Sequence, residues 1–304
     1  METYKNFKDT YQEVTDAVIE QLKKGNIVWR CSWNETGFPT NVTTGVSYRG
    51  WNVFWLNFHT MLKGYQTPRY ITFKQAQHLG GTIRKGESGV KIVYWASIKT
   101  GTAEDVAGDP LSIDEASVRS RMVPKVYTVF NVEQTEGVEF PEVLGSNHTT
   151  IGKIEACEEV IRNMPNPPAL NLQGQYPVYY PLRDEVSVPD KQNFNSCEEY
   201  YCALYHELAH STGHQKRLGR KEIIEPNKFG SEPYSREELT AELTAAFLCG
   251  ITGVGQQTLE NSAAYLQGWL KALKNDKSLI LKAAGQAQKA ADYILNVQYE
   301  QRTT

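Results

Sequence analysis

The chain has 304 residues, of which 40% are hydrophobic and 22% are charged, and its formal net charge is −3. This length allows two domains, each with its own core, and the composition is that of an ordinary soluble protein. No stretch approaches the ~20 apolar residues of a membrane span, and the first thirty residues contain no apolar signal region, so we expect no membrane association.

Cysteines and charges add two further expectations. The five cysteines have no regular spacing, which indicates reduced thiols and a cytoplasmic location. Residues 23–99 contain eleven basic and two acidic residues, a net charge of +9, whereas residues 141–304 contain 16 basic and 20 acidic residues, a net charge of −4. This asymmetry predicts a polyanionic partner for the first half only.

The first half is predicted to mix helices and strands. Apolar residues recur at helical spacing ahead of Gly25, and aromatic and aliphatic residues nearly surround the helix that begins at Trp51. The expected elements are a helix at 6–24, a buried helix at 51–63, a short helix at 72–77, a hairpin at 82–89, and paired strands at 90–98 and 125–131. Between the two strands, a Gly-, Ala-, Ser- and acid-rich stretch at about 100–122 predicts a flexible insertion.

The second half is predicted to be mainly helical, with a few strands. Two of its helices begin at capping-box patterns, Ser196 with Glu199 and Ser235 with Glu238. The other expected elements are a linker at 141–150, a helix at 151–163, strands near 178–181 and 185–188, and helices at 257–274 and 278–298. The fold class is therefore predicted as α+β, with two domains at 1–140 and 151–304.

One helix of the second half carries a metal-binding pattern. His206 and His210 belong to the sequence His-Glu-Leu-Ala-His, which has the H-E-x-x-H spacing. Positions i and i+4 share one helix face, so both imidazoles can bind one Zn²⁺, with Glu207 beside the metal-bound water. The zinc lowers the pKa of that water, and Glu207 can take its proton as a general base.

The third protein ligand has to come from elsewhere. A histidine six residues after the second one would stand at position 216, which is a lysine, and His214 comes two residues too early. A second helix downstream supplies carboxylates. We predict Glu238 as the third ligand and Glu242 as the group that orients a ligand histidine through its free ring N–H. Glu237 is the alternative ligand, or else part of a solvated acidic helix face.

Other residues near the motif receive weaker predictions. Tyr234, which precedes the ligand helix, is predicted to lie near a developing oxyanion. Cys197 and Cys202 are interpreted as packing residues, since the metal site does not need them. The ion is expected to be Zn²⁺, with Mn²⁺ or another divalent cation as the alternative. An edge strand beside such a site would suit an extended peptide substrate.

The first half also has the composition of a surface for single-stranded nucleic acid. Its residues 23–99 interleave 13 aromatic residues with the basic excess, and such proteins bind phosphates with Lys and Arg while bases stack on exposed rings. Trp51, Trp55 and Phe58 are expected in the core. The predicted DNA contacts are Trp33, Asn41, Tyr48, Arg49, Lys74, Arg84, Lys85 and Lys91.

Several segments resemble the ArdC antirestriction family, which is encoded on plasmids and related to the N-terminal part of TraC-type primases. The similar segments are 41–45, 48–52, 68–76, 80–89, 129–134, 206–214 and 234–248.

The resemblance implies an N-terminal domain that binds single-stranded DNA with little sequence preference and a C-terminal zincin-like metallopeptidase domain. It also implies protection of incoming plasmid DNA from host restriction, with an unidentified protein substrate. Glu238 fits the family's E-L-x-x-E pattern, in which a carboxylate completes the metal site. The alternatives are a DNA-binding shield whose metal is structural and, more weakly, DNA processing at the metal site.

Overall fold

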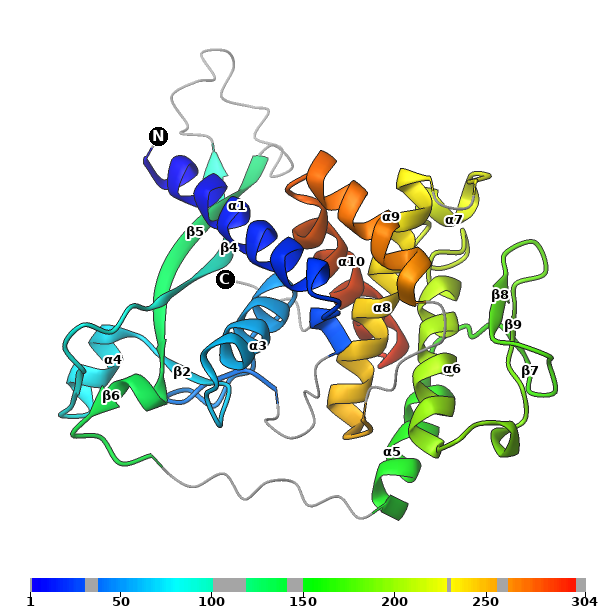
Figure 1. Cartoon of the computed structure of the whole chain (residues 1–304), viewed down its shortest axis with the longest axis horizontal. Coiled ribbons are helices and arrows are strands. Elements are labelled where there is room, and N and C mark those ends of the chain that lie inside the picture. Colours follow the sequence, from blue (N-terminus) through cyan, green and yellow to red (C-terminus); the bar gives the residue numbers. More distant parts are fainter. Residues whose placement is uncertain are drawn as a thin grey trace, which may run out of the picture.

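Figure 1 presents the computed structural model, which describes residues 2–30, 38–100, 119–140, 150–228, 231–255 and 262–298. Within these ranges the chain has a mixed α and β architecture, with most of the sheet in the first half and most of the helices in the second (Figure 1). No helix in the described ranges is both long and apolar enough to cross a membrane.

The first half is built on a four-stranded sheet with the order β1-β2-β5-β4. Strands β4 and β5 form a long antiparallel ribbon, whereas β1 runs parallel to β2. The short strands β3 and β6 form a separate antiparallel pair. The bounds are α1 (Glu2–Lys23), β1 (Thr40–Asn41), α3 (Trp51–Lys63), β2 (Arg69–Ile71), α4 (Phe73–His78), β3 (Thr82–Ile83), β4 (Val90–Thr100), β5 (Arg119–Asn131) and β6 (Thr135–Glu136).

Helix α3 is buried over most of its circumference, as its apolar sequence predicts. It ends at Gly64, which has φ +68°, a left-handed conformation that suits glycine. Two of its side chains bond to the outer edge of β4: Asn52 exchanges two hydrogen bonds with the backbone of Val93, and Trp55 Nε1 donates to the Lys91 carbonyl at 3.1 Å. These bonds satisfy backbone groups that an edge strand would otherwise expose.

The hairpin predicted at 82–89 is wrong. Strand β3 pairs with β6, which lies some fifty residues further along the chain. The segment after β3 is held by Gln134, whose side-chain amide donates to Glu87 Oε2 at 2.9 Å and to the Ser88 carbonyl at 3.0 Å. The turn residues Gly86 and Gly89 therefore shape a loop around a long-range partner, which local sequence patterns do not indicate.

The second half places helices beside a three-stranded sheet with the order β7-β9-β8. Strand β7 was not predicted, because its side chains are exposed and show no alternation between buried and exposed positions. The bounds are α5 (Thr150–Asn163), β7 (Ala169–Asn171), β8 (Val178–Tyr180), β9 (Glu185–Ser187), α6 (Cys197–Ser211), α7 (Lys221–Ile224), α8 (Glu232–Thr252), α9 (Ser262–Asn275) and α10 (Leu279–Ile294).

Helix α8 begins one turn earlier than the predicted capping box. Its N-cap is Ser231, whose hydroxyl accepts a hydrogen bond from the Tyr234 amide at 3.4 Å, and Pro233 lies in the first turn. A proline is favourable there because the amides of the first turn have no partner within the helix. Ser235, predicted as the cap, is instead buried within the helix. The Ser231-Glu-Pro sequence is the better start signal.

The two halves share one hydrophobic core, so the expectation of two separate cores is wrong. Trp29 packs edge-to-face on Trp269 with ring centroids 4.9 Å apart, and the Thr15 hydroxyl donates to the Lys277 carbonyl at 2.8 Å. The predicted linker and most of the predicted insertion lie outside the described residues. The domain boundaries therefore stay predictions.

Candidate metal centre

Two histidines on α6 converge on one point, as their spacing predicts. The helix begins at Ser196, whose hydroxyl accepts a hydrogen bond from the Glu199 amide at 3.1 Å. His206 and His210 lie one turn apart and are both buried, and their Nε2 atoms are 3.1 Å from each other. Two ring nitrogens at this separation can share a proton or a cation.

Helix α8 packs along α6 and adds a carboxylate at the same point. Glu238 Oε2 lies 3.4 Å from His206 Nε2, and Glu238 Oε1 lies 3.7 Å from His210 Nε2. The ligand atoms of the three residues lie within 4.8 Å of one another, and all three residues are buried. The structure thus brings together the three predicted ligands.

The separations between these donors fit a small divalent cation. Tetrahedral zinc holds N and O ligands at about 2.0–2.2 Å, which places neighbouring ligand atoms roughly 3.4 Å apart. The three donor–donor distances of 3.1, 3.4 and 3.7 Å lie around this value. The donor set, two imidazoles and one carboxylate, suits Zn²⁺ and is also acceptable to Mn²⁺.

The carboxylate that holds a candidate ligand histidine is Glu237. Its Oε1 lies 3.0 Å from His210 Nδ1, the ring nitrogen that points away from the other donors. The Arg220 guanidinium donates to both oxygens of Glu237, at 2.8 and 2.6 Å. The solvated acidic face considered for Glu237 is therefore wrong, because this residue and Arg220 are both buried. Glu237 also faces the Nδ1 side of His210, which does not favour it as the third ligand.

Arg220 was not recognised in the sequence. Besides its bonds to Glu237, Arg220 caps the end of α6. Its guanidinium donates to the Ala209 carbonyl at 2.7 Å and to the Thr212 hydroxyl at 2.6 Å. A buried arginine needs several acceptors, and here they come from two helices. No local pattern marks such a residue, although its position just after Gly219 at a chain reversal is a weak signal.

Glu242, predicted to orient a ligand histidine, lies one turn further along α8 and is buried. Its negative charge contributes to a raised pKa of His206. His206 Nδ1 is buried and has no hydrogen-bond partner among the described residues. The orienting hydrogen bond seen in the structure is thus the one that His210 Nδ1 donates to Glu237, while a role for Glu242 remains a prediction.

Mutual attraction of opposite charges dominates the electrostatics of the cluster. Burial lowers the pKa of His206, but the hydrogen bond and charge of Glu238 and the charges of Glu207 and Glu242 raise it to about 9. Burial raises the pKa of Glu238, but His210 and His206, together with a hydrogen bond from Tyr234, lower it to about 2. A divalent cation can replace the protons that hold this cluster together.

The predicted base lies at the edge of the small sheet. Glu207 is buried, which raises the pKa of its carboxyl, and a hydrogen bond from the Tyr179 backbone N–H acts in the opposite direction. Strand β8, which contains Tyr179, is the end strand of its sheet. The base and an end strand are therefore in direct contact. Tyr234 forms a hydrogen bond with Glu238, and its predicted role near a developing oxyanion stays a prediction.

The neighbouring cysteines do not join the metal cluster. Cys202 Sγ lies 3.1 Å from Cys249 Sγ, and both thiols are buried between α6 and α8. This agrees with the interpretation of Cys202 as a packing residue, and Cys197, which received the same interpretation, is half-buried at the start of α6.

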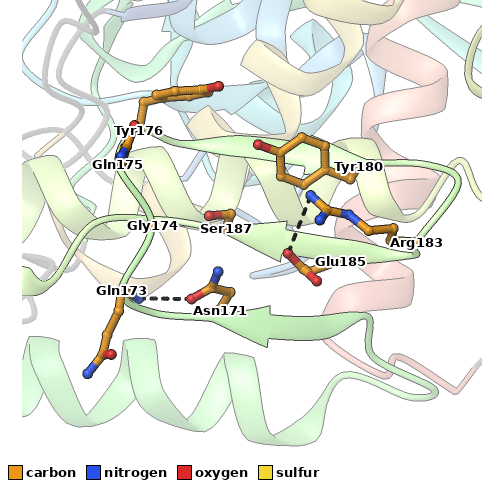
Figure 2. Close-up of a pocket in the computed structure, with 9 residues that line it drawn as sticks. All are labelled: Asn171, Gln173, Gly174, Gln175, Tyr176, Tyr180, Arg183, Glu185 and Ser187. Carbon is orange, nitrogen blue, oxygen red and sulfur yellow. Dashed lines mark hydrogen bonds and ion pairs between the residues drawn. The ribbon is translucent and has the colours of Figure 1, made fainter.

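A hollow lies on the face of the β7-β9-β8 sheet that is opposite to the buried side chains of Tyr179 and Val186 (Figure 2). Its volume is about 270 Å³, and Figure 2 shows the Arg183 guanidinium beneath the Tyr180 ring and directed toward Glu185. Tyr179 and Val186 point to the other face of the sheet and are buried. The hollow is therefore not part of the metal cluster.

The predicted DNA contacts are spread over the first half. Asn41 and Lys74 lie together, because the Asn41 amide donates to Gln75 on α4 at 3.1 Å, and Lys74 is exposed on that helix. Arg49 is exposed, but its Nη2 atom lies 2.7 Å from each carboxylate oxygen of Asp292 on α10, with which it forms an ion pair. Tyr48 is half-buried against the core.

The remaining predicted contacts lie around β3 and β4. Arg84 and Lys85 are exposed, and Arg84 pairs with Glu87 at 3.1 Å, whereas Lys91 is half-buried. Trp33 lies outside the described residues. DNA contact by all of these residues stays a prediction. Trp51, Trp55 and Phe58 are buried, as predicted.

Comparison with known proteins defines the class of each half. Residues 156–286 match the family model described as a zincin-like metallopeptidase, and residues 8–130 match the model for the N-terminal domain of anti-restriction factor ArdC. The three candidate ligands thus lie in a zincin-like domain, as the H-E-x-x-H pattern predicts.

Full-length similarities identify the family. The chain is 34% identical to the metal-free crystal structure of antirestriction protein ArdC from the R388 plasmid, with a TM-score of 0.72, over 93% of this chain and 96% of that one. The Mn(II)-bound crystal structure of the same protein has 33% identity and a TM-score of 0.72, over 94% and 97% of the two chains. The chain belongs to the ArdC antirestriction family.

Two further relatives extend the comparison. The DNA primase TraC of Escherichia coli is 35% identical over 97% of this chain, which spans only 28% of that primase's length. The protein y4eC of Sinorhizobium fredii (strain NBRC 101917 / NGR234) is 31% identical over 94% of this chain and 91% of its own length. The same pair of halves thus occurs both in a primase and in a shorter protein.

The Glu237–Arg220 pair generates a first prediction. Glu237→Gln should weaken Mn²⁺ binding about 10- to 100-fold, because His210 loses the carboxylate that orients it. It should also lower the free energy of unfolding by roughly 3 kcal/mol, because Arg220 keeps a buried charge without its partner. Calorimetric titration with Mn²⁺ and urea unfolding measure the two effects. The control is Glu232→Gln on the same helix, whose exposed carboxylate pairs with Arg236 at 3.3 Å; equal effects of both variants would contradict the assignment.

The raised pKa of His206 generates a second prediction. In the metal-free protein its proton stabilises the fold fully below pH 6.5, and this contribution is lost as the pH rises through about 9. Metal binding must displace that proton, so the apparent Mn²⁺ affinity should rise about tenfold per pH unit between 6.5 and 8.5. Titrations with Mn²⁺ at three pH values test this. The control is His78→Gln, which replaces an exposed histidine on α4 and should show the same pH dependence as the wild type. An affinity independent of pH over this range would contradict it.

Proposed function

We propose that the chain is a metal-dependent peptidase held on single-stranded DNA, which protects incoming plasmid DNA from host restriction. The observation that carries the peptidase half is a buried site that has three protein donors among the described residues, His206, His210 and Glu238, with the carboxylate of Glu207 beside them. Structural zinc sites normally have four protein ligands, whereas catalytic ones leave the fourth position to water. Membership of the ArdC family supports the protective role.

The chemistry follows from the residues around the cluster. An ion bound by the three donors would lower the pKa of a water molecule and polarise a peptide carbonyl. Glu207 would take the proton of that water and later pass it to the leaving amine. The carboxylate of Glu207 faces His206 and His210 from a buried position, where the raised pKa of its carboxyl favours proton uptake.

The sheet beside the base offers a place for the substrate. Strand β8 is an end strand, and its Tyr179 N–H points toward Glu207. An extended peptide that pairs with the outer edge of β8 would bring a backbone carbonyl close to the cluster. This mode of binding recognises backbone groups, which fits a peptidase that acts on unfolded or flexible segments.

The DNA half of the proposal is supported by charge and family membership. Residues 23–99 carry a net charge of +9, and this part of the chain matches the ArdC N-terminal domain. Contacts to phosphates need no particular base sequence, so binding would be largely non-specific.

One observation favours a second function, a DNA-binding shield whose metal only stabilises the fold. The site is nearly closed, since His206 is 6% exposed and Glu207, His210 and Glu238 are each 8% exposed. A peptide would therefore need some opening between α6, α8 and the sheet. Glu207 separates the two functions, because a structural site needs no base.

Replacement of Glu207 tests the peptidase proposal. Glu207→Gln should retain Mn²⁺ binding and lose cleavage of an unfolded protein by at least about 100-fold, as expected for removal of a general base. Glu155→Gln, an exposed carboxylate on α5, is the control and should cleave like the wild type.

The same pair of variants tests the link to protection during conjugative transfer into a restricting host. Loss of protection by Glu207→Gln would join proteolysis to antirestriction. Unchanged protection would assign antirestriction to DNA binding alone. Absence of cleavage by the metal-loaded wild type would contradict the peptidase proposal.

Salt dependence tests the DNA half. Affinity of the full chain for single-stranded DNA should fall steeply between about 50 and 200 mM salt, because each phosphate contact releases a counterion. Fluorescence anisotropy of a labelled oligonucleotide measures it. An affinity that does not change over this range would rule out binding through the basic surface.

A further inference from the structure

The ribbon of β4 and β5 presents different residues on its two faces. In an antiparallel pair, directly opposed residues share a face. Ile92 pairs with Tyr127, and Tyr94 pairs with Lys125. These four side chains therefore project from the same face of the ribbon.

That face changes from buried to exposed along its length. Val90, Ile92 and Val129 belong to the hydrophobic core that includes α3. Beyond them, Tyr94 is 61% exposed and Tyr127 is 46% exposed.

The other face of the ribbon is covered at the same level. Val93 and Pro124 are buried, and Val126 packs against the core. Helix α1 contacts β5 and crosses the ribbon in this region (Figure 1). The tyrosines thus lie on the open face of the ribbon. Its opposite face is covered, and its outer edge is hydrogen-bonded to Asn52 and Trp55 of α3.

The two rings are close enough to act together. Tyr94 and Tyr127 are diagonal neighbours across the strand pair, a relation that places Cα atoms about 7–8 Å apart and lets aromatic side chains reach one another. Neither hydroxyl has a hydrogen bond with another residue in the described part of the chain. Both side chains are also exposed, so their rings can accept a planar group.

The charge around the rings favours a nucleic acid over a protein. Lys125 is exposed beside Tyr94 in the strand register. The sequence of β5 contains three basic residues and no acidic one. Aromatic rings interleaved with cations are the combination that binds bases and phosphates of a single strand.

We propose that Tyr94 and Tyr127 form a base-stacking platform for single-stranded DNA, with Lys125 contacting the phosphates. The proposal rests on single-stranded DNA binding by the first half of the chain and assigns residues to it. Stacking on two rings is tolerant of sequence, because every base has an aromatic face. The platform therefore explains how binding can be firm without base-specific hydrogen bonds.

The experiment compares two strands that differ only in their bases. The probes are an oligothymidylate of about 15 nucleotides and an abasic strand of the same length. Tyr94→Ala and Tyr127→Ala in the full chain should each weaken binding of the oligothymidylate at least about fivefold, and binding of the abasic strand should be unchanged. Tyr94→Phe and Tyr127→Phe should bind like the wild type, because the ring and not the hydroxyl makes the contact.

Two further variants serve as controls. Lys125→Ala should weaken binding of both strands and reduce the slope of log affinity against log salt by about one. Tyr176→Ala removes a tyrosine that is 58% exposed in the other half of the chain and should change neither affinity. Unfolding midpoints of all variants should match the wild type, since the side chains are exposed.

The outcomes separate this inference from the function on which it rests. Wild-type binding of oligothymidylate that persists undiminished in the double alanine variant overturns the platform alone. An equal loss of affinity for both strands overturns stacking as its basis. A change in self-association without a change in DNA affinity assigns the face to a protein contact instead. Absence of wild-type binding overturns both the platform and the DNA half of the proposed function.

Discussion

The packing of α6 against α8 is the constraint on which the rest of the structure depends. It places four carboxylates, Glu207, Glu237, Glu238 and Glu242, in a buried layer next to two histidines. Burying like charges is costly unless each has a partner. Arg220 neutralises one of them, and the histidines, when protonated, offset part of the rest. A divalent cation would complete the compensation, which is a physical reason for such a cluster to bind one.

The same constraint links stability to the candidate chemistry. Arg220 bonds both to Glu237 and to the carbonyl at the end of α6, so one side chain holds the two helices and, through Glu237, the ring of His210. Small changes in the approach of the helices would alter both distances from Glu238 to the histidines together. The precision of the cluster thus depends on a buried ion pair between Arg220, the N-cap residue of α7, and Glu237 of α8.

Side-chain contacts join the two halves. Trp29 on Trp269 and Arg49 on Asp292 tie the first half to α9 and α10, and the hydrophobic core runs through both halves. The proposed DNA surface and the metal cluster therefore keep a defined relation to each other. In the proposed function this arrangement would keep the peptidase site at a set position relative to bound DNA.

Local patterns were sufficient for part of this structure. The spacing of His206 and His210, the cap at Ser196 and the apolar circumference of α3 depend on residues a few positions apart. The sequence by itself therefore determined helix α6, the two candidate ligands on it and the buried helix of the first half. It did not determine that Gln134 would hold the loop after β3 or that Arg220 would bond to Glu237, because these contacts join residues that are distant in the chain. Only the tertiary structure decided which of the acidic residues Glu237, Glu238 and Glu242 on α8 faces the histidines and which faces Arg220. Helix periodicity gives the relative directions of these side chains, but it does not give the neighbour that each of them meets.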